Sequence, residues 1–241
     1  MRVSLFITCL ADQFAPDVGE SVVRVLRKLG CEVDFPTAQT CCGQPFFNNG
    51  FRQQARALAE RMIDIFEDSA HVVSPSGSCV AMVREHFPVL FEGDSEWQPR
   101  CDAFVAKTYE FIEFITKVLK VDVEAVCRQK LTYHYTCHLR GLGLKQEAVR
   151  VIEQLKDGEY VPMEKSDQCC GFGGTFAVKF PQVSKAMVDD KADCIVATGA
   201  DVVIVNDTGC AMNIGGMLSR RGISCQVRHL AQILDEGLQG K

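Results

Sequence analysis

The sequence predicts an internally duplicated α/β protein with two pseudo-symmetric domains, each built on a mainly parallel sheet. Two observations lead to this fold class. Short apolar runs typical of buried strands alternate with segments of helical periodicity along the 241 residues. The order of these segments in the first half returns in the second half. We therefore expect one domain over residues 1–125 and another over residues 126–241.

The first half is expected to run strand, helix, strand, loop, helix, strand, helix. Pro16 opens a helical pattern that ends at Gly30, where glycine suits a helix end. Strands are expected over 4–10, 31–35 and 71–74, and helices over 16–29, over 51–67 and from 79 to 86. Farther along, 91–100 has the composition of an irregular connection, 104–107 resembles another strand, and 109–119 has helical spacing.

The second half repeats this order after a link at 122–129. An apolar strand ends just before Cys137, as the first strand ends at Cys9. The other expected elements are a helix around 149–152, a short strand over 160–162, a helix over 183–197 and a strand over 200–205. Segment 227–234 parallels segment 106–112.

Composition narrows the classes of function. The net charge is −5 and there is no basic block, which argues against nucleic acid as a main partner. No apolar run approaches the roughly 20 residues that a membrane span needs. The N-terminal segment is too short and wrongly flanked for a signal peptide. We therefore expect a cytoplasmic protein without a membrane span.

Cysteines provide the strongest signal. The chain has 13 of them, and cytoplasmic cysteines serve metal binding or redox chemistry more often than disulfides. The letters Cys-Cys-Gly occur at 41–43 and again at 169–171. In each half, 31 residues separate an upstream cysteine from the pair, and another cysteine follows downstream. The eight repeated cysteines are Cys9, Cys41, Cys42, Cys79, Cys137, Cys169, Cys170 and Cys210.

Each set of four sulfurs is expected to converge on one metal or iron–sulfur site. In α/β sheets, ligands gather beyond the carboxyl ends of the strands, where these cysteines are expected. Thiolates are soft ligands that select iron–sulfur clusters or zinc. The glycine after each pair allows close approach of the backbone or a positive φ. The remaining cysteines have no partner in the repeat and are expected to be small core residues: Cys31, Cys101, Cys127, Cys194 and Cys225.

The doubled pattern resembles the cysteine-rich CCG domain. That domain occurs in heterodisulfide reductases, where each cysteine set holds a noncubane 4Fe–4S cluster, and in iron–sulfur subunits of glycolate and anaerobic glycerol-3-phosphate oxidation. At this length, the chain is most similar to family members that serve lactate utilization. The resemblance implies an iron–sulfur electron-transfer subunit for the oxidation of L-lactate to pyruvate. It also implies iron–sulfur and accessory partner proteins.

One departure from the family pattern bears on the cofactor. The full pattern ends in C-x-x-C, whereas Met82 and Asn213 stand at the last position here. Each half therefore offers four patterned ligands, which suffice for one ordinary 4Fe–4S cluster or for a zinc ion. One or two iron–sulfur clusters are the favoured cofactor, with zinc as an alternative at one site. Two other functions remain open, a heterodisulfide or thiol reductase and a zinc-binding structural protein.

Several residues near the cysteines have simpler interpretations. His138 follows Cys137, but neighbours at a strand end point to opposite faces, so a nucleophile–base pair is not expected. His134 and His229 are expected to be packed or surface residues. Segment 206–208 has the composition of a turn. The glycine-rich segment 171–174 fits close approach to a cofactor as well as it fits an anion-binding loop.

Overall fold

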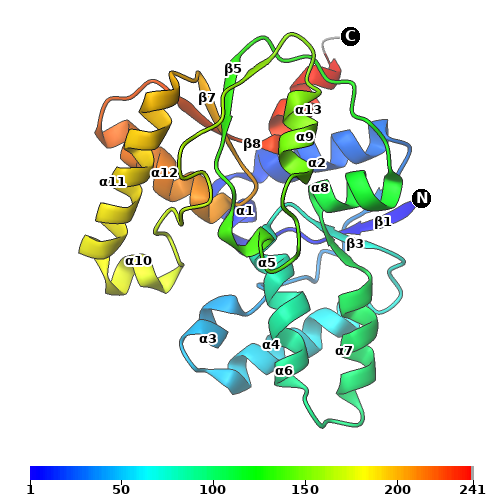
Figure 1. The fold of residues 1–241 in the computed structure, drawn as a ribbon. Helices are drawn as coiled ribbons and strands as arrows, with labels where there is room; N and C mark the ends of the chain where they lie inside the picture. Colours follow the sequence, from blue (N-terminus) through cyan, green and yellow to red (C-terminus); the bar gives the residue numbers. More distant parts are fainter. Residues whose placement is uncertain (240–241) are drawn as a thin grey trace. The chain divides into compact units, whose positions relative to one another are not determined.

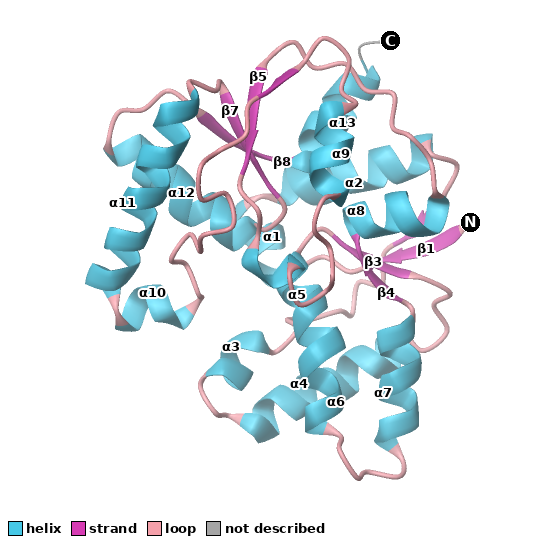
Figure 2. Ribbon diagram, viewed as in Figure 1, coloured by secondary structure: helices cyan, strands magenta, loops and turns pink. Residues whose placement is uncertain are grey.

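The computed structural model describes residues 1–239, which divide into two compact units. The first comprises 1–120 with 141–143, and the second comprises 121–140 with the chain from 144 onward. Each unit contains one four-stranded sheet, and every strand pair in both sheets is parallel. Helices cover the strands of each sheet (Figures 1 and 2). The predicted α/β class with a duplicated parallel sheet is therefore confirmed.

In the first unit the strand order is β2-β1-β3-β4. Its strands are β1 (Arg2–Leu5), β2 (Glu32–Asp34), β3 (Val72–Ser74) and β4 (Thr108–Glu110). Its helices are α1 (Cys9–Phe14), α2 (Pro16–Lys28), α3 (Gln44–Asn48), α4 (Arg52–Ile65), α5 (Gly77–Ala81), α6 (Phe87–Leu90), α7 (Trp97–Ala106) and α8 (Phe111–Glu113). Two π-helical segments, η1 (Met82–His86) and η2 (Phe114–Leu119), extend α5 and α8.

One expectation for the first unit holds only in part, and another is wrong. Residues 91–100 are expected to be irregular, but their last part lies in α7. Residues 104–107 are expected as a strand, but they are mostly the last turn of that helix. The strand β4 begins only at Thr108, whose hydroxyl donates to the carbonyl of Phe104 at 2.7 Å. Phe104 is buried, as a strand residue would be, but it belongs to the helix. A run of four residues is too short for periodicity to separate the two structures.

The second unit has the corresponding order, β6-β5-β7-β8. Its strands are β5 (Lys130–Tyr133), β6 (Glu159–Tyr160), β7 (Val202–Val205) and β8 (Gln226–His229). Its helical segments are η3 (Cys137–Leu139), α9 (Glu147–Glu153), α10 (Thr175–Lys179), α11 (Pro181–Thr198), α12 (Thr208–Arg220) and α13 (Leu230–Gln239). β7 is buried along its whole length, as expected for the middle of a covered parallel sheet.

The two sheets share their strand order and the register of their central strands. Ser4 pairs with Val72 in the first, and Thr132 pairs with Val203 in the second. The first residue of each pair lies five residues before the upstream cysteine of its half. The second residue lies seven residues before the downstream cysteine. The chain leaves the two paired strands toward opposite edges of the sheet, which creates a topological switch point at their carboxyl ends. Both cysteine sets begin there.

Among residues 1–239, no helix combines the length and the apolar character needed to cross a bilayer.

Candidate metal centres

The first cysteine set lies beyond the carboxyl ends of β1 and β3. Cys9 opens α1 after the N-cap Thr8, rather than ending the strand as expected, because β1 stops at Leu5. Cys79 lies in the short helix α5. The Cys9 and Cys41 Sγ atoms are 3.6 Å apart, and the Cys42 and Cys79 Sγ atoms are 3.4 Å apart. The structure therefore brings the four predicted sulfurs of this half together.

Hydrogen bonding favours a thiolate in the middle of this set. The thiols of Cys42 and Cys9 lower the pKa of Cys41 to about 3, and the backbone N–H of Gly43 contacts the same sulfur at 3.5 Å. The pKa of Cys42 is raised by its hydrogen bonds to neighbouring thiols and by burial. The thiolate is the form that binds a metal, so the set is prepared to supply at least one charged ligand.

The second set repeats this arrangement. Cys137 opens η3 after β5, and Cys210 lies in the first turn of α12. The Cys170 and Cys210 Sγ atoms are 3.3 Å apart, and hydrogen bonds from Cys137 and Cys170 lower the pKa of Cys169 to about 2. The backbone N–H of Gly171 contacts the Cys169 sulfur at 3.4 Å. Each half thus presents four thiols that fit the requirements of a soft metal centre.

Each set has a buried end and an open end. Cys9 is exposed, and Cys41 is half-buried, whereas Cys42 and Cys79 are buried. In the second set the half-buried sulfurs belong to Cys137 and Cys169, and the buried ones to Cys170 and Cys210. A group held by such a set would be shielded on one side and reachable from solvent on the other.

The glycine of each pair has the expected special backbone. Gly43 has φ of 83° and Gly171 has φ of 82°, a region that residues with a Cβ rarely adopt. A Cβ at Gly171 would also lie 2.8 Å from the carbonyl oxygen of Ser184 on α11. At Gly43 the corresponding contact, with the carbonyl oxygen of Ala55 on α4, would be 3.4 Å. Both pairs therefore need glycine, and the second packs more tightly against its helix.

The surroundings of the two sets differ at equivalent positions. Phe6 and His134 each lie three residues before the upstream cysteine, and both are fully buried. Met82 and Asn213 each lie three residues after the downstream cysteine. Met82 packs in the same apolar cluster as Cys42 and Cys79, together with Phe6. The Asn213 amide instead donates to the carbonyl of Cys170 at 2.8 Å.

A third position follows the same trend. Met62 on α4 lies seven residues after Ala55, and Lys191 on α11 lies seven residues after Ser184. Both are fully buried, but the Lys191 ammonium donates to the carbonyls of Lys165 and Ser166, in the loop before the second pair. Burial lowers the pKa of Lys191. The buried cysteines of both sets therefore pack in apolar clusters, but the second set has polar neighbours where the first has methionines.

His134 is the residue that sequence reasoning missed. One of its ring nitrogens and the sulfurs of Cys170 and Cys210 all lie within 4.8 Å of one another. The hydrogen bond from Cys170, followed by the nearby His134 ring, lowers the pKa of Cys210 to about 7. The sequence signal that could have identified it is a histidine directly after an apolar strand, at the position that a phenylalanine occupies in the other half.

The expectation for His138 is wrong. Its Nδ1 lies 3.6 Å from the Cys137 sulfur, although neighbours on a strand would point apart. β5 ends at Tyr133, so Cys137 and His138 lie in the turn of η3, where strand alternation no longer applies. The expectation for His229 is confirmed, because it is buried and its Nδ1 accepts from the backbone N–H of Ala231 at 3.1 Å.

One smaller expectation is confirmed, and another holds in part. Asp207 caps α12 by accepting from the backbone N–H of Gly209 at 3.0 Å, which is turn chemistry rather than acid–base chemistry. Three of the unpatterned cysteines, Cys31, Cys101 and Cys127, are buried, and Cys194 and Cys225 are half-buried. All cysteines are free thiols, so neither set is tied up in a disulfide.

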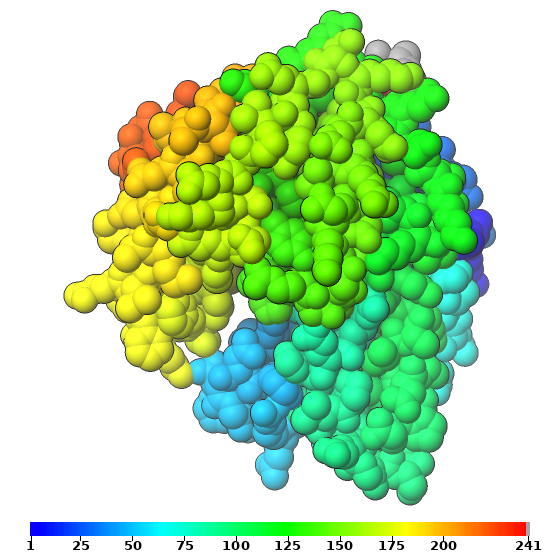
Figure 3. All heavy atoms as spheres, viewed as in Figure 1, coloured from blue at the N-terminus to red at the C-terminus, as the bar shows by residue number. Residues whose placement is uncertain are grey.

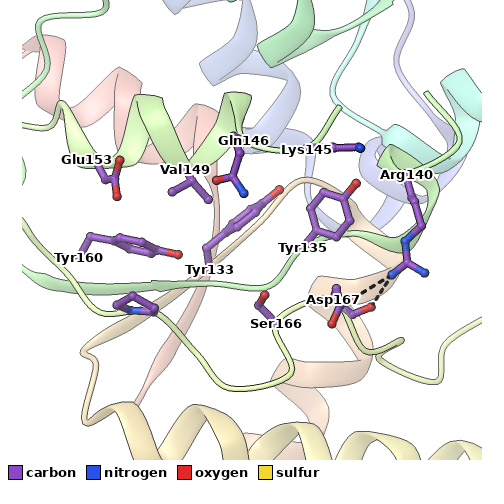
Figure 4. Close-up of a pocket in the computed structure, with 11 residues that line it drawn as sticks. Tyr133, Tyr135, Arg140, Lys145, Gln146, Val149, Glu153, Tyr160, Ser166 and Asp167 are labelled. Carbon is purple, nitrogen blue, oxygen red and sulfur yellow. Dashed lines mark hydrogen bonds and ion pairs between the residues drawn. The ribbon is translucent and has the colours of Figure 1, made fainter. Parts of the chain in front are cut away.

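A pocket of about 660 Å³ opens in the second unit, between the end of β5 and α9. Tyrosine rings form much of its wall, and Arg140 and Lys145 lie toward one end (Figure 4). Arg140 contacts Asp167 at 3.3 Å. Tyr135 and Asp167 lie two residues before Cys137 and Cys169. The pocket therefore combines aromatic surface with charged groups of both signs, and two of its lining residues are close in sequence to cysteines of the second set.

Comparison with known proteins agrees with this geometry. The sequence matches the cysteine-rich domain CCG twice, over residues 3–84 and 131–215. It is 48% identical over 237 residues to lactate utilization protein A of Shouchella clausii, covering 98% of this chain and 99% of that protein. The identity to lactate utilization protein A of Bacillus subtilis is 47% with the same coverage. The chain belongs to the lactate utilization protein A family of CCG-domain proteins. The eight patterned cysteines all lie within the two regions that match the CCG domain.

A solved structure supports the fold beyond this family. A hypothetical protein from Helicobacter pylori superposes with a TM-score of 0.70 at 11% identity, covering 100% of this chain and 49% of that chain. At this identity the likeness concerns the fold alone. The family relationship of the chain rests on the sequence matches.

Proposed function

We propose that this chain is an iron–sulfur electron-transfer subunit of a system that oxidises L-lactate to pyruvate. The observation that carries the proposal is the doubled set of four thiols at the strand ends, in a chain that matches lactate utilization protein A along almost its whole length. Each set would hold one cluster. Cys9, Cys41, Cys42 and Cys79 would hold the first, and Cys137, Cys169, Cys170 and Cys210 the second.

The redox balance explains why such a subunit needs partners. Oxidation of L-lactate to pyruvate releases two electrons and two protons. A bound iron–sulfur cluster would accept and release electrons one at a time. The four thiols supply the ligands, and the N–H groups of Gly43 and Gly171 stabilise negative charge on sulfur. Partner proteins of the lactate-utilization system, including another iron–sulfur protein, would deliver and remove electrons in the cytoplasm.

The open end of each set is the proposed route for electrons. The buried sulfurs would fix the group in the protein, while the half-buried or exposed sulfurs would face the donor or acceptor. Exposed apolar side chains follow both pairs closely in sequence. They are Phe46 and Phe51 in the first unit, and Val178, Phe180 and Val183 in the second. These side chains give a partner apolar surface near the cysteines.

A single experiment tests the proposed role in lactate oxidation. The complex that contains this chain is purified anaerobically from cells grown on L-lactate, and its visible absorption is followed after addition of L-lactate. We expect bleaching of the iron–sulfur absorption, and loss of bleaching when Cys41→Ser and Cys169→Ser are combined. A complex that dithionite bleaches but L-lactate leaves unchanged would contradict the role while leaving the clusters in place.

A zinc site is the second candidate, because one structural feature favours it. The closest sulfurs in each set are 3.3–3.6 Å apart. Sulfurs bound to one tetrahedral zinc ion at about 2.3 Å would lie roughly 3.8 Å apart, closer than ligands on different iron atoms of a cluster. Zinc would make the chain a structural or interaction subunit. Metal and sulfide content separates the two candidates.

A further inference from the structure

The second cysteine set contains a nitrogen donor that the first lacks. His134 is fully buried, and one of its ring nitrogens lies within 4.8 Å of the Cys170 and Cys210 sulfurs, which are themselves 3.3 Å apart. The equivalent position in the first unit is occupied by Phe6, which packs against Cys42 and Cys79. The two halves therefore share their thiols but differ in the side chain beside the buried pair.

His134 is also unsatisfied within its own fold. Among residues 1–239, neither of its ring nitrogens makes a hydrogen bond of ordinary length, and the ring interacts only weakly with the Cys210 thiol. A buried polar group without a partner costs about 1–3 kcal/mol, so a unit with no other use for this ring would be more stable with an apolar one. Phe6 shows that the fold accepts an apolar ring at this position.

A packing role does not account for this ring. His229 is another buried histidine of the same unit, and its Nδ1 accepts from the backbone N–H of Ala231. His134 instead lies beside two thiols, in the one group of three His, Cys, Asp or Glu side chains within residues 1–239 whose ligand atoms all lie within 4.8 Å of one another. Imidazole nitrogen and thiolate sulfur together suit zinc and iron centres.

We infer that His134 is a metal ligand of the second centre, which makes that centre a mixed nitrogen–sulfur site while the first is bound by sulfur alone. This inference deepens the proposed function and rests on its second cysteine set. The fifth donor replaces the last cysteine of the family pattern, whose position is taken by Asn213. The two centres of the duplicated chain are therefore chemically unequal.

The inequality has a redox consequence. Both centres have four thiolates, so the neutral imidazole leaves the ligand charge unchanged and any difference in potential comes from the groups around each centre. Lys191 and Asn213 add polar groups near the second set, whereas Phe6, Met62 and Met82 lie in the apolar cluster of the first set. The second centre should therefore have the higher reduction potential.

Cobalt binding tests the ligand directly, without any catalytic assay. The full chain is prepared without metal, and Co²⁺ is titrated into a Cys42→Ser/Cys79→Ser background, so that its spectrum reports the second set. We expect d–d bands at shorter wavelength than in the reciprocal Cys170→Ser/Cys210→Ser background, since nitrogen is a stronger-field ligand than sulfur. His134→Phe and His134→Gln should each remove this difference and weaken Co²⁺ binding at least about tenfold.

His138 provides the matched control, because its ring also lies near a cysteine of this set. His138→Gln should leave the cobalt bands of the second set unchanged. Circular dichroism of each variant verifies folding, and two different replacements of His134 guard against a local packing defect. If both His134 variants keep the cobalt spectrum and affinity of the parent background, or if His138→Gln alone removes the difference, the inference is overturned.

A second measurement separates this inference from the proposed function. Protein with ¹⁵N-labelled histidine is reconstituted with iron and sulfide, and pulsed EPR of the reduced centre detects directly bound nitrogen. We expect a histidine coupling that disappears in His134→Phe. Clusters without this coupling would overturn the inference and leave the function standing. If the cobalt experiment gives the expected result but no cluster forms on reconstitution, the proposed iron–sulfur function is overturned. The assignment of His134 as a metal ligand then remains.

Discussion

His134 and Phe6 occupy equivalent positions in the two units, and the ring of each is fully buried beside a pair of cysteines. The histidine makes no hydrogen bond of ordinary length among residues 1–239, so its burial has a stability cost in the metal-free protein. We therefore predict that His134→Phe raises the free energy of unfolding of the metal-free chain by about 1–2 kcal/mol. Thermal or urea unfolding in the presence of a chelator measures this change.

The reciprocal change is the control for that prediction. Phe6→His introduces an unpaired imidazole into the apolar cluster of the first unit and should lower the free energy of unfolding by about 1–3 kcal/mol. If His134→Phe destabilised the metal-free chain as much as Phe6→His does, the ring of His134 would have a packing role after all.

The glycines of the two pairs give a graded test of loop geometry. Ala at Gly171 must adopt a positive φ and bring its Cβ to 2.8 Å from the Ser184 carbonyl, whereas Ala at Gly43 meets its nearest atom at 3.4 Å. We expect Gly43→Ala to cost about 1–2 kcal/mol and Gly171→Ala at least about 1 kcal/mol more. Chemical unfolding of both variants gives the comparison.

Gly222→Ala is the matched control, since Gly222 has φ of 65° and nothing within 4 Å of an added Cβ. The loss of stability in Gly222→Ala therefore measures the cost of backbone strain without a close contact. If Gly171→Ala and Gly222→Ala lower the free energy of unfolding equally, the close contact of the loop with α11 does not contribute to stability.

Each cysteine set should lose its metal independently. Cys42→Ser is expected to empty the first set and Cys170→Ser the second, because each residue is a buried member of a four-thiol group within one unit. The metal content of each variant should fall to about half that of the parent, as expected for two separate sites. Cys101→Ser, which alters a buried cysteine outside both sets, should keep the full content. Complete loss of metal in either single variant would show that the sets depend on each other.

The exposed segment after the second pair is the predicted contact for a partner subunit. Val178 is 80% exposed and Phe180 54% exposed at the end of α10, whose segment is coloured yellow on the surface in Figure 3. Val178→Asp combined with Phe180→Asp should abolish co-purification with the lactate-utilization partners and leave metal content unchanged. The control is Val89→Asp, at a residue of the first unit that is 55% exposed. Loss of the partners in the control alone would place the contact elsewhere.

Much of this arrangement can be predicted from the sequence because it repeats. The doubled spacing of the cysteines reflects two sheets with the same strand order and the same register of their central strands, so the grouping of sulfurs into two sets follows from the order of strands. Local details do not follow in this way. Cys137 and His138 approach each other only because the strand ends at Tyr133, and strand ends are set by tertiary packing.

The ligand role proposed for His134 lies beyond sequence patterns for a different reason. A histidine on a buried strand can pack against neighbours, cap a turn or bind a metal, and the choice depends on which atoms surround it. His229 and His134 show two of these outcomes within one unit. Only the comparison with Phe6 at the equivalent place identifies His134 as a residue with no packing requirement.

The central claim is that each cysteine set holds an iron–sulfur cluster, and metal and sulfide analysis of anaerobically purified protein tests it most directly. Iron, zinc and acid-labile sulfide are measured together on the full chain, with EPR after reduction. We predict a brown protein with iron and sulfide in about equal amounts and an EPR signal that appears on reduction. Stoichiometric zinc without sulfide, or a colourless protein that takes up no iron after anaerobic reconstitution, would contradict the account.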